Sequence, residues 1–180
     1  MNEDALSLHG EWGLKAYPAG TVSLGESVTV QTENGWFIGK RVDTLHEPDF
    51  ELAGHNLITA TGQTLICDML MDTASFDTGL TYHAIGTSST AVASGNTQLT
   101  AEYNRLAITS KSRNGNVLTF STFFTAAQSA ASIQEAGLFG HNTASTASNS
   151  GILFNRYLVA LNNSASLYDV SWEYRLTIGS

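Results

Sequence analysis

The sequence predicts an all-β protein, an antiparallel β-sandwich or jelly-roll-like body with one short packed α-helix near residues 61–72. Composition is the first observation: the 180 residues include 21 Thr, 19 Ser and 16 Gly, and only 13% are charged. Threonine favours strands, and Ser and Gly favour turns. Second, short apolar runs alternate with turn signals along most of the chain. Third, residues 170–178 alternate apolar and polar side chains, as a half-buried strand does.

The first 54 residues are expected to form acidic N-terminal strands or an arm, and residues 55–180 the sandwich body. Turn signals such as Pro18-Ala-Gly and Asn34-Gly35 separate the strands. The expected strands are Leu6–Tyr17, Thr21–Val30, Trp36–Leu45 and Phe50–Ala53. The sequence leaves open whether they form a docking subdomain or belong to the same sandwich.

One segment, Thr61–Asp72, has the spacing of a helix. Its apolar residues Leu65, Ile66, Met69 and Leu70 fall on one face of a 3.6-residue period. Thr59 or Thr61 can cap its first turn. A helix of about three turns is stabilised mainly by packing, so we expect this face to lie on a sheet.

The rest of the chain has the pattern of strands. The clearest hairpin signal is Arg113-Asn-Gly-Asn116, and the polar segment His141–Gly151 is expected to be a mobile loop tip. The expected strands are Leu80–Gly86, Arg105–Lys111, Val117–Thr125, Ile133–Phe139, Ile152–Leu161 and Leu167–Ile178.

Charge and composition exclude several classes of protein. The net charge of −8 argues against nucleic-acid binding, which needs a basic surface. No apolar run approaches the roughly 18 residues of a membrane span, and no signal peptide is visible, so we expect no membrane association. The single Cys67 cannot form an internal disulfide. The acidic residues concentrate in residues 1–77, which hold 12 acidic and 3 basic side chains against 4 and 5 in the remainder.

No catalytic, cofactor-binding or metal-binding pattern emerges from the residues. The five histidines are scattered, with no pair at ligand spacing, and one cysteine cannot make a cysteine-rich zinc site. We therefore expect no enzyme, no cofactor and no metal. A pair of carboxylates of the glycosidase type, drawn from Glu102, Glu135 and Glu173, is the alternative left open.

Five short motifs occur in order over residues 55–178. They are His55–Gly62, Tyr82–Ala91, Asn96–Leu99 with Glu102, Glu135–Phe139 and the final strand Trp172–Ile178. Together they resemble a group of small structural proteins of tailed bacteriophages. Ser88 and Asn96 depart mildly from that pattern, in which Gly and Asp are common. From the residues themselves, Gly86 and Gly137 indicate close backbone approach, and Glu135 is expected to be paired or on an outer face.

The resemblance implies a non-enzymatic virion structural protein, assembled in the bacterial host cytoplasm. We expect a head decoration (cement) protein that binds the major capsid protein on the outer head surface, as a homo-oligomer. A tail, baseplate, collar or fibre-anchoring subunit is the alternative within this class, with tail proteins as partners. An alternative of another class is a carbohydrate-binding module for host glycans, with Trp12, Trp36 and Trp172 available to stack on sugars.

Four aromatic residues of the N-terminal strands are the candidate partner contacts. Trp and Tyr are enriched at interface hot spots, so exposed aromatic side chains here would suit docking. The candidates are Trp12, Tyr17, Trp36 and Phe37. The alternative is that they form a small core between these strands.

Overall fold

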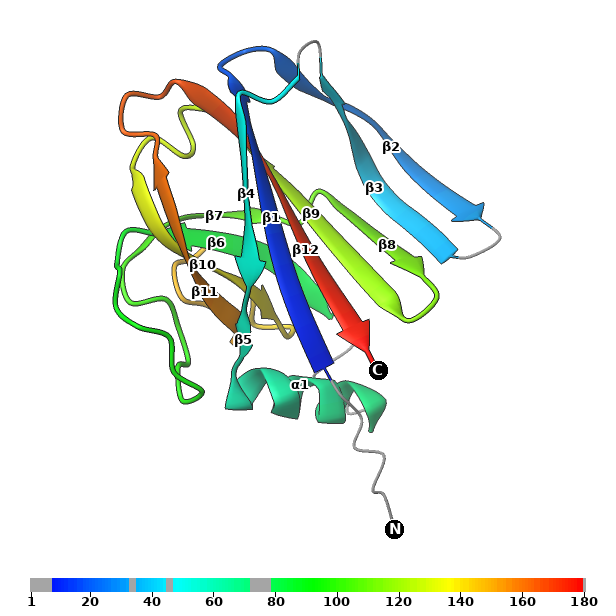
Figure 1. Ribbon diagram of the computed structural model, residues 1–180. Helices are drawn as coiled ribbons and strands as arrows, with labels where there is room; N and C mark the ends of the chain where they lie inside the picture. Colours follow the sequence, from blue (N-terminus) through cyan, green and yellow to red (C-terminus); the bar gives the residue numbers. More distant parts are fainter. Residues whose placement is uncertain (1–7, 33–34, 45–46, 72–78, 180) are drawn as a thin grey trace.

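Two antiparallel sheets pack face to face, so the predicted all-β sandwich with one short helix is confirmed (Figure 1). The computed structural model describes residues 8–32, 35–44, 47–71 and 79–179. Within them, sheet A has the strand order β2-β3-β8-β9-β12-β1-β4 and sheet B the order β5-β11-β10-β6-β7. The elements are β1 (Leu8–Pro18), β2 (Val22–Thr32), β3 (Gly35–Thr44), β4 (Phe50–His55), β5 (Leu57–Ile58), α1 (Ala60–Leu70), β6 (Leu80–Gly86), β7 (Glu102–Ala107), β8 (Ser110–Asn114), β9 (Val117–Phe124), β10 (Ser132–Gly140), β11 (Ile152–Asn162) and β12 (Tyr168–Ile178).

The N-terminal strands belong to sheet A. Strand β1 lies between β12 and β4, with Leu8 opposite Ile178 at one end and Pro18 opposite Tyr168 at the other. The β2–β3 hairpin joins the same sheet, because Gly35–Gly39 of β3 pairs with β8. In Figure 1 this hairpin continues sheet A past the edge of the sandwich. Of the two arrangements that the sequence left open, the structure therefore has strands of one sandwich.

The core between the sheets is rich in aromatic rings. Trp172 and Tyr174 of β12 are buried, in agreement with the alternation of this strand. Trp12 of β1 stacks on Tyr157 of β11 with ring centroids 5.1 Å apart, and its ring lies 6.3 Å from that of Trp172. Aromatic pairs at these distances contribute about 0.5–1.5 kcal/mol beyond their buried area. The rings thus connect β1, β11 and β12 across the core.

Helix α1 closes one end of the sandwich (Figure 1). The Thr59 side chain caps it by accepting a hydrogen bond from the Gly62 N–H at 3.0 Å, as the sequence predicts. Gly62 touches β11 so closely that a β-carbon would overlap the carbonyl oxygen of Phe154. No helix among the described residues is long and apolar enough to cross a membrane.

The apolar face predicted for this helix is buried only in part. Leu65 is 1% exposed and Ile66 packs against the core, but Met69 is 45% and Leu70 is 81% exposed. The expectation that all four pack on a sheet is therefore wrong for the last two. The physical reason is that the helix is held close to β11 at Gly62, in its first turn. Its last turn therefore lies beyond sheet B.

The single strand expected at Arg105–Lys111 is in fact two strands in different sheets. The Ile108 N–H still donates to Thr81 of sheet B, whereas the next N–H, of Thr109, donates to Ser121 of sheet A. The chain crosses between the sheets at these two residues. The hairpin that follows is as predicted, with Gly115 at φ +58°, a backbone conformation that favours glycine.

Candidate functional site

Sheet B is covered on both faces, and the cover on its outer face consists of two long loops. Residues 87–101 and 141–151 lie over this face, and between the loops and the sheet is a second apolar cluster of Ala84, Leu99, Phe139 and Leu153. All four residues are fully buried. Three of the four, Ala84, Leu99 and Phe139, belong to the sequence motifs Tyr82–Ala91, Asn96–Leu99 and Glu135–Phe139.

The first loop is held by a buried ion pair between two neighbouring strands. Nε of Arg156, on β11, donates to Oε2 of Glu135, on β10, at 2.7 Å. Glu135 also accepts from the backbone N–H of Thr100 at 3.1 Å and of Ala101 at 2.7 Å. Glu135 is thus paired, one of the two outcomes that the sequence allowed, and its carboxylate binds the end of the loop.

The other guanidinium nitrogens of Arg156 bind the middle of the same loop. They donate to the carbonyl oxygens of Thr90 at 2.8 Å and Ala91 at 3.1 Å, and to the side-chain oxygen of Asn96 at 3.2 Å. The four hydrogen bonds that this fully buried arginine donates therefore pair the Glu135 carboxylate with a cation and give two loop carbonyl oxygens a donor. We call Glu135, Arg156 and these loop contacts the first clamp.

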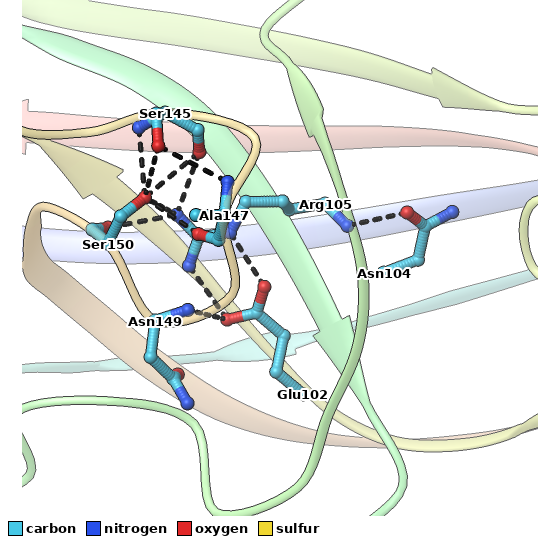
Figure 2. Close-up of polar contacts among 7 residues, drawn as sticks. All are labelled: Glu102, Asn104, Arg105, Ser145, Ala147, Asn149 and Ser150. Carbon is cyan, nitrogen blue, oxygen red and sulfur yellow. Dashed lines mark hydrogen bonds and ion pairs between the residues drawn. The ribbon is translucent and has the colours of Figure 1, made fainter.

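A second clamp holds the loop 141–151, as Figure 2 shows. Arg105 binds Glu102 through two parallel hydrogen bonds of 2.6 and 2.7 Å. The remaining terminal nitrogen of Arg105 donates to the carbonyl oxygen of Ser150 at 2.9 Å, and Glu102 accepts from the N–H of Asn149 at 2.9 Å. The guanidinium also lies 4.3 Å from the centroid of the Phe139 ring, a cation–π contact.

The loop 141–151 is therefore anchored to sheet B through Arg105 and Glu102, a contact that its polar composition alone did not indicate. The Ser150 hydroxyl joins the two sides of the loop: it accepts from the Ser145 N–H at 2.9 Å and donates to the Ala147 carbonyl at 2.7 Å. The polar residues of this loop, from which mobility was expected, thus form hydrogen bonds within it.

Gly86 and Gly137 allow neighbouring backbone segments to approach closely, as the sequence predicts. A β-carbon at Gly86 would lie 2.6 Å from the carbonyl oxygen of Ala101, in the first loop. A β-carbon at Gly137 would overlap the carbonyl oxygen of Asn155 on the neighbouring strand. Larger residues at either position would push the loop or the strand away.

The structure does not support docking through Trp12 and Tyr17. Trp12 is 8% and Tyr17 is 7% exposed, so the expectation that they are exposed is wrong. Trp12 instead fills the main core against Tyr157, which also means that it forms no separate core of the N-terminal strands. The side chains of Trp36 and Phe37 lie outside the described part of the structure, and their backbone is in β3.

Burial also weakens the glycan-binding hypothesis. Sugar stacking needs an exposed aromatic face, and neither Trp12 nor Trp172 offers one, since Trp172 is 1% exposed. The side chain of the third tryptophan, Trp36, is not described.

The three candidate carboxylates are each held by an arginine. Glu102 and Glu135 are in the two clamps, and Glu173 lies on the outer face of sheet A, where it pairs with Arg175 at 2.7 Å. The structure thus divides them between the two sheets. Among the described residues, no group of three or more His, Cys, Asp or Glu side chains is placed to hold a metal ion.

The histidines are equally dispersed. His83 is buried in the core, where its Nε2 lies 3.0 Å from the Tyr157 hydroxyl, and burial lowers its pKa to about 3. His55 is exposed on β4, and His141 lies in the second loop. His46 and the side chain of His9 are outside the described residues.

Within the described part of the chain, no loop covers the outer face of sheet A. A groove of about 570 Å³ runs over β4, β1 and β12, with Gly13 and Ala53 between rims of charged side chains. One rim carries the pair of Lys15 and Glu51, 3.0 Å apart, whose hydrogen bond raises the pKa of the lysine. Sheet A also ends at β2 and β4, which have no further neighbour among the described strands.

Comparison of the chain with protein-family models, with curated proteins and with solved structures finds no match.

Proposed function

We propose that this protein is a non-enzymatic structural subunit of a tailed-bacteriophage virion, a decoration protein that binds the outer surface of the head. It would contact the major capsid protein and neighbouring copies of itself. The five ordered motifs are the reason for choosing a virion.

The observation that carries the proposal is the asymmetry of the sandwich. Sheet B is covered on its outer face by two clamped loops, whereas no described segment covers the outer face or the two edge strands of sheet A. A sandwich with one covered and one uncovered outer face is suited to bind a larger surface through the uncovered face. Weak contacts of this kind are multiplied over the many copies of a lattice.

The β2 edge is the natural place for contacts between copies. This strand has 11 residues and a partner, β3, on one side only among the described strands. Long unpaired edges present free N–H and C=O groups and tend to add a strand from another chain. Such strand addition between copies would produce the homo-oligomer.

The test is gold-labelled antibody against this protein on purified particles, viewed by negative-stain electron microscopy. Label spread over the head is the expected result. Label confined to the tail or its tip would replace the proposal with a tail, baseplate or fibre-anchoring subunit. Particles without label, from a preparation in which the antibody recognises the purified protein, would contradict a virion role.

A further inference from the structure

An apolar groove lies between α1 and the inner face of sheet A, separate from the open outer face discussed above. Its volume is about 330 Å³, in the range of small-ligand pockets. Its walls include Leu65, Met69 and Leu70 of α1, Leu118 and Phe120 of β9, and Ile178 of β12. The half of the helix that the core leaves uncovered forms one of these walls, which accounts for the exposure of Met69 and Leu70.

Lys111 is the one charged residue among the described residues that line this groove. It lies on β8 directly opposite Phe120 and is half-buried. No hydrogen bond or ion pair joins its ammonium group to another group in the described part of the chain, in contrast to the arginines of both clamps and to Lys15. Burial lowers the pKa of this lysine.

The lysine also borders a second, more polar hollow. That hollow has a volume of about 350 Å³ and is lined by Thr81, Tyr82, His141 and Asn142, among others. Lys111 thus lines both the apolar groove and this less apolar hollow. A half-buried cation that lines an apolar groove and has no anionic partner among the described residues is complementary to a ligand with one negative end and one apolar end.

We infer that this groove binds an aliphatic monocarboxylate, with its chain along the apolar walls and its carboxylate at Lys111. An aliphatic chain fits these walls better than a peptide does. A peptide would bring N–H and C=O groups that need partners, and the walls are formed almost wholly by carbon. This inference is independent of the proposed virion function.

The test uses decanoate as the probe, with decanol and decyltrimethylammonium for comparison, titrated calorimetrically into the full chain. We expect saturable binding of decanoate that is tighter than that of decanol, and no comparable binding of the cation. The Lys111→Met variant should bind decanoate about tenfold more weakly and decanol as before. Met69→Ser, at a partly exposed wall position, should weaken both ligands alike.

Lys15→Met is the matched control, because it removes a lysine from the opposite face of sheet A and should leave decanoate binding unchanged. Circular dichroism of each variant checks that the fold is kept. The absence of saturable decanoate binding would overturn the inference. Equal decanoate affinities of the parent chain and Lys111→Met would also overturn it, because binding would then be adsorption to apolar surface alone.

Discussion

The outer faces of the two sheets use the same chemistry in opposite environments. On sheet B, the side chains of Glu135 and Arg156 are 0% exposed and those of Glu102 and Arg105 are 1–2% exposed. On sheet A, the pairs Lys15–Glu51 and Glu173–Arg175 have side chains that are 44–58% exposed. A buried charge that loses its partner is costly, whereas exposed pairs contribute about 0–1 kcal/mol. The N–O distance alone therefore does not measure how much an ion pair contributes to stability.

The difference is in what else the charged groups bind. Each buried arginine also binds carbonyl oxygens of a loop, and each buried glutamate binds loop N–H groups. Desolvated charges need all their hydrogen bonds, so only one placement of the loop satisfies them. We conclude that the clamps specify where the loops lie, while the exposed pairs leave the outer face of sheet A adaptable.

The largest expected effect comes from breaking the first clamp. Arg156→Met would leave the Glu135 carboxylate buried without its cation and two loop carbonyls without a donor. We expect the free energy of unfolding to fall by about 3–5 kcal/mol, measured by urea denaturation. The double variant with Glu135→Gln should lose less than the sum of the two single variants, because the pair acts as a unit. A loss below about 1 kcal/mol for Arg156→Met would equate this pair with the exposed ones.

A second effect, which grows only as the pH falls below 6.5, is expected in the core between the two sheets. Folded His83 has a pKa near 3, whereas its ordinary value is 6.5, so below pH 6.5 the unfolded chain takes up a proton that the folded chain does not. Its contribution to stability is complete above pH 6.5 and is lost as the pH falls toward 3. The slope is about 1.4 kcal/mol per pH unit over that window.

His83→Gln removes this titration and keeps a group that can bond the Tyr157 hydroxyl. The pH dependence of its unfolding free energy should therefore be shallower than that of the parent chain below pH 6.5, and the same above it. Carboxylates titrate alike in both proteins and cancel in the comparison. Identical slopes would mean that His83 is not a neutral, buried group.

The smallest expected effect is at an exposed pair. Lys15→Met should change the free energy of unfolding by less than about 1 kcal/mol, because solvent screens the contact with Glu51. The same urea denaturation that tests the first clamp measures it. A loss as large as that of Arg156→Met would show that burial does not distinguish the two faces.

Local features were predictable from the sequence because their causes are local. The Thr59 cap, the Gly115 turn and the alternation of β12 each depend on residues a few positions apart. The strand switch at Ile108 and Thr109 was not predictable, since both residues suit a strand and only the hydrogen-bonding partners change sheet.

The clamps were predictable only in part. The Glu135 motif was identified, but its partner Arg156 was not, because the pair joins different strands and no spacing links them. One signal was present: Arg156 is a charged residue within the largely apolar strand β11. A charge inside an apolar strand needs a buried partner, and this criterion would have selected it. The burial of Trp12 had no such signal, because aromatic residues suit both cores and interfaces.

The position of β1 has a consequence for how the chain folds. Strand β1 is the first of the described strands, yet one of its two neighbours is β12, the last of them, and the two strands pair along their full length. Until β12 has been synthesised, β1 can pair only with β4, and sheet A remains divided. Contacts between such distant segments make folding slow and leave strand edges open in the meantime. Sheet A can therefore become continuous only once β12 has been synthesised, and a chain without β12 would leave β1 and β4 separated from β9, β8, β3 and β2.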